Sequence, residues 1–200
     1  MQLLAAALPY PRRSTAYGAF SDKRIGLRKV RYDSIAMVAD YLERKRGTRP
    51  FPARADILPE ELRFALGKII LLDVQYDPLD FIYRLYGSEI AAMDRDEVTG
   101  KSVRDDETPP YRDMLIRHYT EAVTERSPTF HEIVVTLDRT SAGCQRAIFP
   151  LSDDGTAINM LLAVSGWNND LNFIWPKVLE LDCGPFPGLG GSGRRRRRED

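Results

Sequence analysis

Residues 71–91, LLDVQYDPLDFIYRLYGSEIA, contain two apolar runs separated by a short polar break. The break carries aspartate and proline, whose backbone preferences favour a turn. In the second run Phe81, Tyr83 and Leu85 share one face and Arg84 lies on the other, which is the period of a strand with one face on a core. This stretch therefore predicts an antiparallel hairpin that leads into short helical turns.

Helical periodicity lies on both sides of this hairpin. Ile35, Val38, Ala39 and Leu42 recur at helical spacing, so an amphipathic leading helix is expected over residues 33–46. A second amphipathic helix is expected at about residues 111–125, and three further strands are expected at residues 130–139, 144–151 and 157–167. Strands on both sides of a helical middle predict an α+β domain with one five-stranded antiparallel sheet.

The charges divide the chain into three parts. Seven basic side chains and one acid occupy residues 1–32, which we expect to form a basic, flexible arm. Residues 33–193 carry 17 basic and 26 acidic side chains, a net charge of −9, so nucleic-acid binding is not expected of this part. We place the domain at residues 33–182 and a disordered tail rich in glycine and arginine at residues 183–200.

Other features of the composition disfavour several classes of protein. Cys144 and Cys183 are far apart and lack the spacing of a zinc ligand pair, so neither a disulfide framework nor a metal site is predicted. No apolar run approaches the roughly 18 residues of a transmembrane helix, and the first residues lack the features of a signal peptide. A cytoplasmic protein is therefore expected.

Four short motifs carry a resemblance to a known family. They are Arg-Ala-Asp-Ile at residues 54–57, Phe-x-Tyr-Arg-Leu-x-Gly at residues 81–87, Thr-Gly-Lys-Ser at residues 99–102 and Pro-Leu-Ser-Asp-Asp-Gly at residues 150–155. Over about residues 35–165 the chain resembles short, stand-alone bacterial PAS-domain proteins. The resemblance implies a five-stranded antiparallel sheet that cups a cavity, with helices on one face. It also implies a leading helix that often packs at a homodimer interface. Packing of residues 33–46 onto the chain's own sheet is an equal alternative.

The resemblance and the periodicity together indicate residues that would line a ligand pocket between the sheet and the long helix. They are Tyr83, Leu85, Ile90, Leu115, His118, Ile133, Val135, Met160 and Leu162. Tyr83 and His118 would be the polar contacts in a mostly apolar pocket. The alternative is that these side chains simply fill a core.

The sequence leaves cofactor chemistry open. His118 lies at the edge of the apolar stripe of the long helix, where some PAS domains hold haem, although a hydrogen-bonded or surface histidine fits the sequence better. A covalent flavin adduct is not expected because the turns after the hairpin contain no cysteine, whereas noncovalent flavin stays an alternative. No catalytic residues are predicted, since neither a Ser–His–acid nor a Cys–His arrangement can be placed.

Three functions are compatible with the sequence. The first is a sensory module that binds a small molecule, and the second is a dimerisation or interaction adaptor with a filled core. The third, an enzyme, is disfavoured. A cavity of several hundred cubic ångström would favour the sensor. An exposed apolar patch on a solid core would favour the adaptor. His118 close to acidic side chains at a cleft would favour the enzyme. A homodimer and an unidentified signalling partner are expected for the first two.

Overall fold

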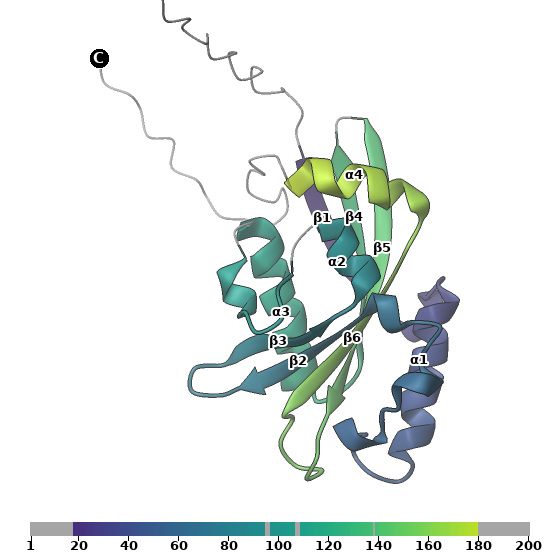
Figure 1. The fold of residues 1–200 in the computed structure, drawn as a ribbon, viewed down its shortest axis with the longest axis vertical. Coiled ribbons are helices and arrows are strands. Elements are labelled where there is room, and N and C mark those ends of the chain that lie inside the picture. Colours follow the sequence, from purple (N-terminus) through teal and green to yellow (C-terminus); the bar gives the residue numbers. More distant parts are fainter. Residues whose placement is uncertain (1–17, 95–96, 107–108, 138, 180–200) are drawn as a thin grey trace, which may run out of the picture.

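The computed structural model describes residues 18–94, 97–106, 109–137 and 139–179. These residues form one six-stranded sheet in the order β1-β4-β5-β6-β2-β3, in which all neighbouring strands are antiparallel (Figure 1). The strands are β1 (Gly18–Ile25), β2 (Ile69–Gln75), β3 (Asp80–Tyr86), β4 (Thr129–Leu137), β5 (Thr140–Leu151) and β6 (Met160–Trp167). The hairpin predicted from residues 71–91 is confirmed as β2 and β3.

Helices pack against this sheet. The α-helices of the described part are α1 (Asp33–Arg46), α2 (Ser88–Asp94), α3 (Pro109–Glu125) and α4 (Asn169–Leu179). Short 3-10 helices occur at Leu27–Lys29, Arg54–Asp56, Pro59–Glu61, Leu66–Lys68 and Val103–Asp105. The predicted leading helix and long helix are confirmed as α1 and α3, whereas α4 has no counterpart in the predictions. In the described part of the chain, no helix has both the length and the apolar character needed to cross a membrane.

The sheet buries apolar side chains on both of its faces. On one face α2, α3 and α4 cover the inner core, which includes Phe81 and Tyr119. On the opposite face α1 covers the outer core, which includes Val38 and Leu162 (Figure 1). Strands β5 and β6 are buried along most of their length because both of their faces are covered. The helices α2, α3 and α4 therefore lie on one face of the sheet, as expected, and the leading helix α1 lies on the other face.

The leading helix α1 packs on the chain's own sheet. Its buried side chains are Ile35, Val38, Tyr41 and Leu42. The Tyr41 hydroxyl donates a hydrogen bond to the carbonyl oxygen of Asp56 and accepts one from the N–H group of Leu58, each at 3.0 Å. These bonds satisfy backbone groups that a short connecting segment would otherwise leave unpaired. The apolar stripe and the Tyr41 hydroxyl together hold α1 against the outer core.

A sixth strand extends the five that were predicted. β1 pairs with β4 from Gly18, opposite Leu137, to Ile25, opposite Phe130. Residues 18–25 of the predicted arm are therefore part of the sheet, whereas residues 1–17 and the predicted tail lie outside the described residues. The segment SDKRI lacks the alternation of apolar residues that predicts a strand, because its charged side chains form ion pairs with α3 and β4.

A β-bulge removes Leu85 from the core. The register between β2 and β3 shifts so that Leu71 lies opposite Leu85 and Leu72 lies opposite Tyr83. One extra residue in a strand reverses the facing of the side chains that follow it. Leu85 is consequently 37% exposed, and Tyr86 packs against the inner core instead. The prediction that Leu85 faces the core is therefore wrong.

Candidate functional site

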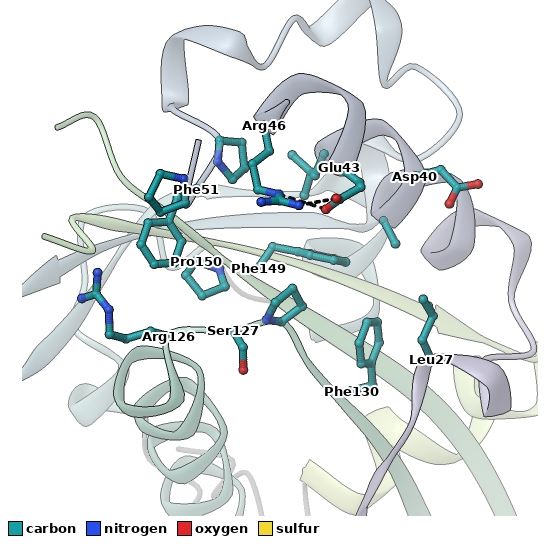
Figure 2. A pocket seen from close by; sticks show the side chains of 15 residues that line it. Leu27, Asp40, Glu43, Arg46, Phe51, Arg126, Ser127, Phe130, Phe149 and Pro150 are labelled. Carbon is teal, nitrogen blue, oxygen red and sulfur yellow. Dashed lines mark hydrogen bonds and ion pairs between the residues drawn. The ribbon is translucent and has the colours of Figure 1, made fainter. Parts of the chain in front are cut away.

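A pocket of about 510 Å³ lies between α1 and the strands β4 and β5 (Figure 2). Its lining includes the rings of Phe51, Phe130 and Phe149. Four prolines add further apolar surface, Pro50, Pro52, Pro128 and Pro150. Small-molecule sites are typically cavities of about 300–1,000 Å³ with mostly apolar linings and few polar groups. This pocket therefore has the size and the character of a ligand site.

The pocket exists because α1 leaves one side of the outer face uncovered. α1 lies against β6, so Phe130 on β4 lies beyond the part of the sheet that the helix covers. Phe130 and Phe149 contact each other edge to face, with ring centroids 6.0 Å apart. On the helix side the lining residues include Ala39, whose short side chain fills little of the space, and Leu42.

The two arginine side chains of the pocket lining, Arg46 and Arg126, already have partners. Arg46 donates from Nε to Oε2 of Glu43 on the same helix, at 3.0 Å (Figure 2). The Arg126 guanidinium lies 4.9 Å from the centroid of the Phe51 ring, and it donates to the carbonyl oxygen of Thr156 at 2.8 Å. The pocket therefore offers mainly apolar contacts, with its arginine side chains engaged elsewhere.

The cavity predicted between the sheet and α3 is nearly filled. Phe81 and Tyr119 contact each other in this space, with ring centroids 5.4 Å apart. A cavity of about 20 Å³ remains among α2, α3, α4 and β5, and its lining includes Ile90 and Ile133 from the predicted set. This volume holds about one water molecule. The inner core is thus a packed interior around this small and mostly apolar gap.

Arg146 of β5 brings a charge into the inner core beside this gap. Its side chain is 5% exposed, Nε donates to Oγ of Ser165 at 3.2 Å, and Nη2 donates to the Tyr111 hydroxyl at 3.0 Å. Nη1 is buried and has no hydrogen-bond partner among the described residues. A buried donor without an acceptor costs about 1–3 kcal/mol, and more when it is charged. Both N–H donors of Arg146 Nη1 therefore lack an acceptor within the described residues.

Asp94, at the end of α2, is a second ionisable side chain beside the inner core and is partly buried. The Tyr86 hydroxyl and the indole N–H of Trp175 both donate to its carboxylate, the indole at 2.5 Å. Burial raises the pKa of Asp94 to about 6, although these hydrogen bonds and the positive charge of Arg146 act in the opposite direction. The carboxylate joins α2 to β3 and α4.

His118 lies away from both cavities, where α3 meets β1. Its Nε2 is 2.7 Å from Oδ2 of Asp22, and its ring stacks on His131 with 3.6 Å between the centroids. Burial lowers the pKa of His118 against the effect of Asp22, and burial together with His118 lowers the pKa of His131 to about 2. Because one ring face and Nε2 are occupied and neither cavity reaches His118, these residues do not fit a haem or a substrate cleft.

The structure distributes the nine predicted pocket residues over four environments. Five lie in the inner core: Tyr83, Ile90, Leu115, Ile133 and Val135. Met160 and Leu162 lie in the outer core, Leu85 is exposed, and His118 lies beside β1. Strand alternation could not assign β6 to the correct side because both of its faces are buried. None of the nine lines the pocket beside α1.

Sequence reasoning missed the residues of this pocket, although one sequence signal pointed to Arg146. Cys144, Arg146 and Ile148 share one face of their strand, which places a charge among apolar neighbours. No comparable signal exists for Phe130 and Phe149, because their pocket depends on where α1 lies over the sheet. Local patterns do not encode that placement.

An antiparallel sheet with helices packed on both of its faces is the architecture of an α+β domain. Residues 30–162 match the sequence profile of the PAS domain, and the chain therefore belongs to the PAS domain family. β1 and α4 lie outside the matched residues. A comparison with curated proteins finds none that matches the chain.

Proposed function

We propose that this PAS domain is a sensory module that binds a small apolar molecule in the pocket beside α1. The observation that most directly supports this function is the 510 Å³ pocket, in which Phe51, Phe130 and Phe149 provide aromatic surface (Figure 2). Aromatic rings bury large areas and pack against flat or aliphatic groups. A ligand with an apolar body and a polar end directed to the charged rim would match this lining.

The expected affinity follows from the area that such a ligand can bury. A molecule that buries about 300 Å² of apolar surface gains roughly 7 kcal/mol at about 25 cal/mol per Å². Lost translational and rotational freedom offsets part of this gain. The dissociation constant should therefore be micromolar or weaker. Sensing of a metabolite present at micromolar to millimolar concentration would suit this range.

The leading helix α1 would transmit the occupancy of the pocket. Ala39 and Leu42 line the pocket, while Val38 of the same helix packs in the outer core. An occupant that contacts Ala39 would change how α1 rests on the sheet, as a shift between two packings of the helix. Met37 is exposed on α1, so a signalling partner could detect the shift on that surface.

The adaptor alternative draws support from the nearly filled inner core. In that case the pocket beside α1 would accept an apolar side chain from another protein or from a second copy of the chain. The buried stripe of α1 is engaged with its own sheet, so a homodimer would have to use other surfaces of the domain. Native mass spectrometry of the purified protein distinguishes a retained small molecule from a dimer without one.

Binding of the apolar fluorescent dye anilinonaphthalene sulfonate tests the pocket directly. The substitution Ala39→Trp puts an indole into the pocket and should weaken dye binding at least about tenfold, or roughly 1.4 kcal/mol. Ala36→Trp is the matched control because Ala36 lies on the exposed side of the same helix. The control should bind the dye as the unaltered protein does. Equal binding by the two variants would contradict the proposed site.

Amide hydrogen exchange tests transmission by α1 separately from binding. Saturation of the pocket with the same dye should change the exchange rates of residues 35–45, since their packing on the outer core depends on the occupant. Exchange in α2 and α4, which pack on the opposite face of the sheet, should change less. If the dye binds at the pocket and α1 exchanges at an unaltered rate, the pocket is a binding site but the transmission route is wrong.

A further inference from the structure

Three side chains of the kinds that metal ions prefer converge where β1, α3 and β4 meet. Asp22 comes from β1, His118 from α3 and His131 from β4. One potential donor atom from each residue lies within 4.8 Å of the others. His118 is 0% and His131 is 1% exposed, and the Asp22 side chain is 10% exposed. The three residues are far apart in sequence, so the fold alone brings them together.

The hydrogen bonds of the protein do not fully satisfy this cluster. Nδ1 of His118 is buried and has no hydrogen-bond partner among the described residues. Nε2 of His131 lies 3.2 Å from Oγ1 of Thr129. A buried polar nitrogen without a partner costs free energy. The proposed ion would bind through Nε2 of His118, which faces Asp22, so Nδ1 of His118 would keep its environment.

We propose that Asp22, His118 and His131 form a binding site for a divalent transition-metal ion of the zinc class. Imidazole nitrogen and carboxylate oxygen are ligands that Zn²⁺, Co²⁺ and Fe²⁺ share, whereas Mg²⁺ and Ca²⁺ prefer oxygen ligands alone. Oε2 of Glu121 on α3 lies 3.7 Å from Nε2 of His131, close enough to supply a fourth ligand after a small rotation.

Binding requires local rearrangement of these side chains. Bonds from ligand atoms to Zn²⁺ are about 2.0–2.2 Å long, so two ligands on a tetrahedral ion lie about 3.3 Å apart. Oδ2 of Asp22 and Nε2 of His118, now 2.7 Å apart, must separate to admit the ion. An imidazole binds a metal in the plane of its ring, so the His118 and His131 rings must tilt out of their nearly parallel stack, whose interplanar angle is 17°.

Arg117 already orients the Asp22 carboxylate for this role. Its Nη2 donates to Oδ1 of Asp22 at 2.8 Å, and its Nη1 lies 3.2 Å from Oδ2. The stronger contact is therefore on Oδ1, which leaves Oδ2 facing His118. Groups outside the ligand set that hold a ligand in position commonly raise metal affinity by 10- to 100-fold, roughly. Arg117 is a positioning residue in this sense.

The charged groups around the cluster include both carboxylates and guanidinium groups. Arg24 forms ion pairs with Glu121 and Glu125, at 3.3 Å and 2.8 Å, so its positive charge is compensated. Arg146 lies opposite His131 on the adjacent strand and adds a further positive charge. Coordination by Glu121 would offset that charge by bringing a second carboxylate to the ion. The site should therefore require the carboxylate of Glu121 as well as that of Asp22.

A bound ion would attach the sixth strand to the rest of the domain. Asp22 lies outside the residues that match the PAS family profile, whereas His118 and His131 lie within them. The site is therefore formed between the family core and a strand added at its edge. An ion that binds only the folded arrangement stabilises it in proportion to the logarithm of the ion concentration. Zinc should slow amide hydrogen exchange in β1.

Titration of the chelator-treated full-length protein with Zn²⁺ and with Co²⁺ tests this proposal, with calorimetry and native mass spectrometry as readouts. One ion should bind per chain. Asp22→Asn and His131→Gln should each weaken binding at least about 100-fold, since each removes a ligand. Glu125→Gln is the matched control, because it removes a nearby carboxylate that is paired with Arg24 and is not a proposed ligand.

Imidazole nitrogen NMR spectra of the unaltered protein provide a test that does not depend on how the variants fold. The chain contains two histidines, so every histidine signal reports on this cluster. One equivalent of Zn²⁺ should shift both sets of signals. Absence of zinc binding, equal binding by all three variants, or binding that leaves the histidine signals unmoved would each overturn the proposal.

Discussion

Arg146 of β5 donates a hydrogen bond from Nη2 to the hydroxyl oxygen of Tyr111 on α3, with 3.0 Å between the two atoms. The same guanidinium bonds Ser165 on β6 and leaves Nη1 without an acceptor among the described residues. This one side chain therefore links the sheet to α3 while keeping a positive charge in the inner core. Its charge also favours the ionised form of Asp94.

Arg146→Met should raise the pKa of Asp94 above its value of about 6, because the nearby positive charge is lost. Two buried hydroxyl groups also lose a donor, so the free energy of unfolding should fall by roughly 1–3 kcal/mol near neutral pH. The loss should be smaller near pH 5, where Asp94 is protonated. Denaturant unfolding at the two pH values measures both effects, and a cost that does not depend on pH would argue against charge coupling.

Asp94→Asn should change how stability depends on pH. The folded protein holds the Asp94 proton up to about pH 6, whereas the reference value for the unfolded chain is 3.8. Between these values the folded state binds more protons, so this group lowers stability as pH rises. The variant lacks that loss and should gain up to roughly 3 kcal/mol relative to the unaltered protein between about pH 4 and pH 7.

The quantity to measure is the difference in unfolding free energy between Asp94→Asn and the unaltered protein. The buried histidines make stability rise with pH, and because they do so equally in both proteins, their effect cancels in this difference. Urea unfolding followed at half-unit pH steps gives this difference. A constant difference across the range would show that Asp94 is ionised in the folded state throughout.

Leu161→Ala and Leu162→Ala should reveal that the two cores respond separately. Both side chains are fully buried, Leu161 in the inner core and Leu162 in the outer core. Each substitution should lower the free energy of unfolding by about 2–5 kcal/mol. Hydrogen exchange should accelerate mainly in α3 and α4 for Leu161→Ala and mainly in α1 for Leu162→Ala. The same pattern in both variants would contradict the assignment of faces.

Gly87→Ala should destabilise the fold where the chain leaves β3. A Cβ atom at this position would lie 2.5 Å from the backbone oxygen of Gly67, which cannot move aside as a side chain could. A cost of about 1–3 kcal/mol is expected in thermal or denaturant unfolding. Gly26→Ala is the matched control, since nothing lies within 4 Å of the corresponding Cβ, and it should change stability by less than about 0.5 kcal/mol.

Local sequence patterns predicted most elements of the fold, since α1, α3 and five of the strands have clear apolar periods. β1 was missed because its contacts are ionic. α4 contains Pro176, which interrupts the pattern expected of a helix. The side of the sheet on which Leu85 lies depends on a β-bulge. Both faces of β6 are buried, so the side on which Met160 lies could be predicted only from the positions of the helices. Both features depend on strand pairing and helix packing, which the sequence of a single strand does not determine.

Strand β5 contributes Arg146 to the inner core and Phe149 to the pocket on the opposite face. Only the backbone of one strand separates these two environments, so a tilt of β5 that widens the pocket would also move the guanidinium. Substitutions at the two positions should therefore have non-additive effects on stability, although the side chains do not touch. Evolution of a new ligand preference beside Phe149 would then be constrained by which residues position 146 can accept.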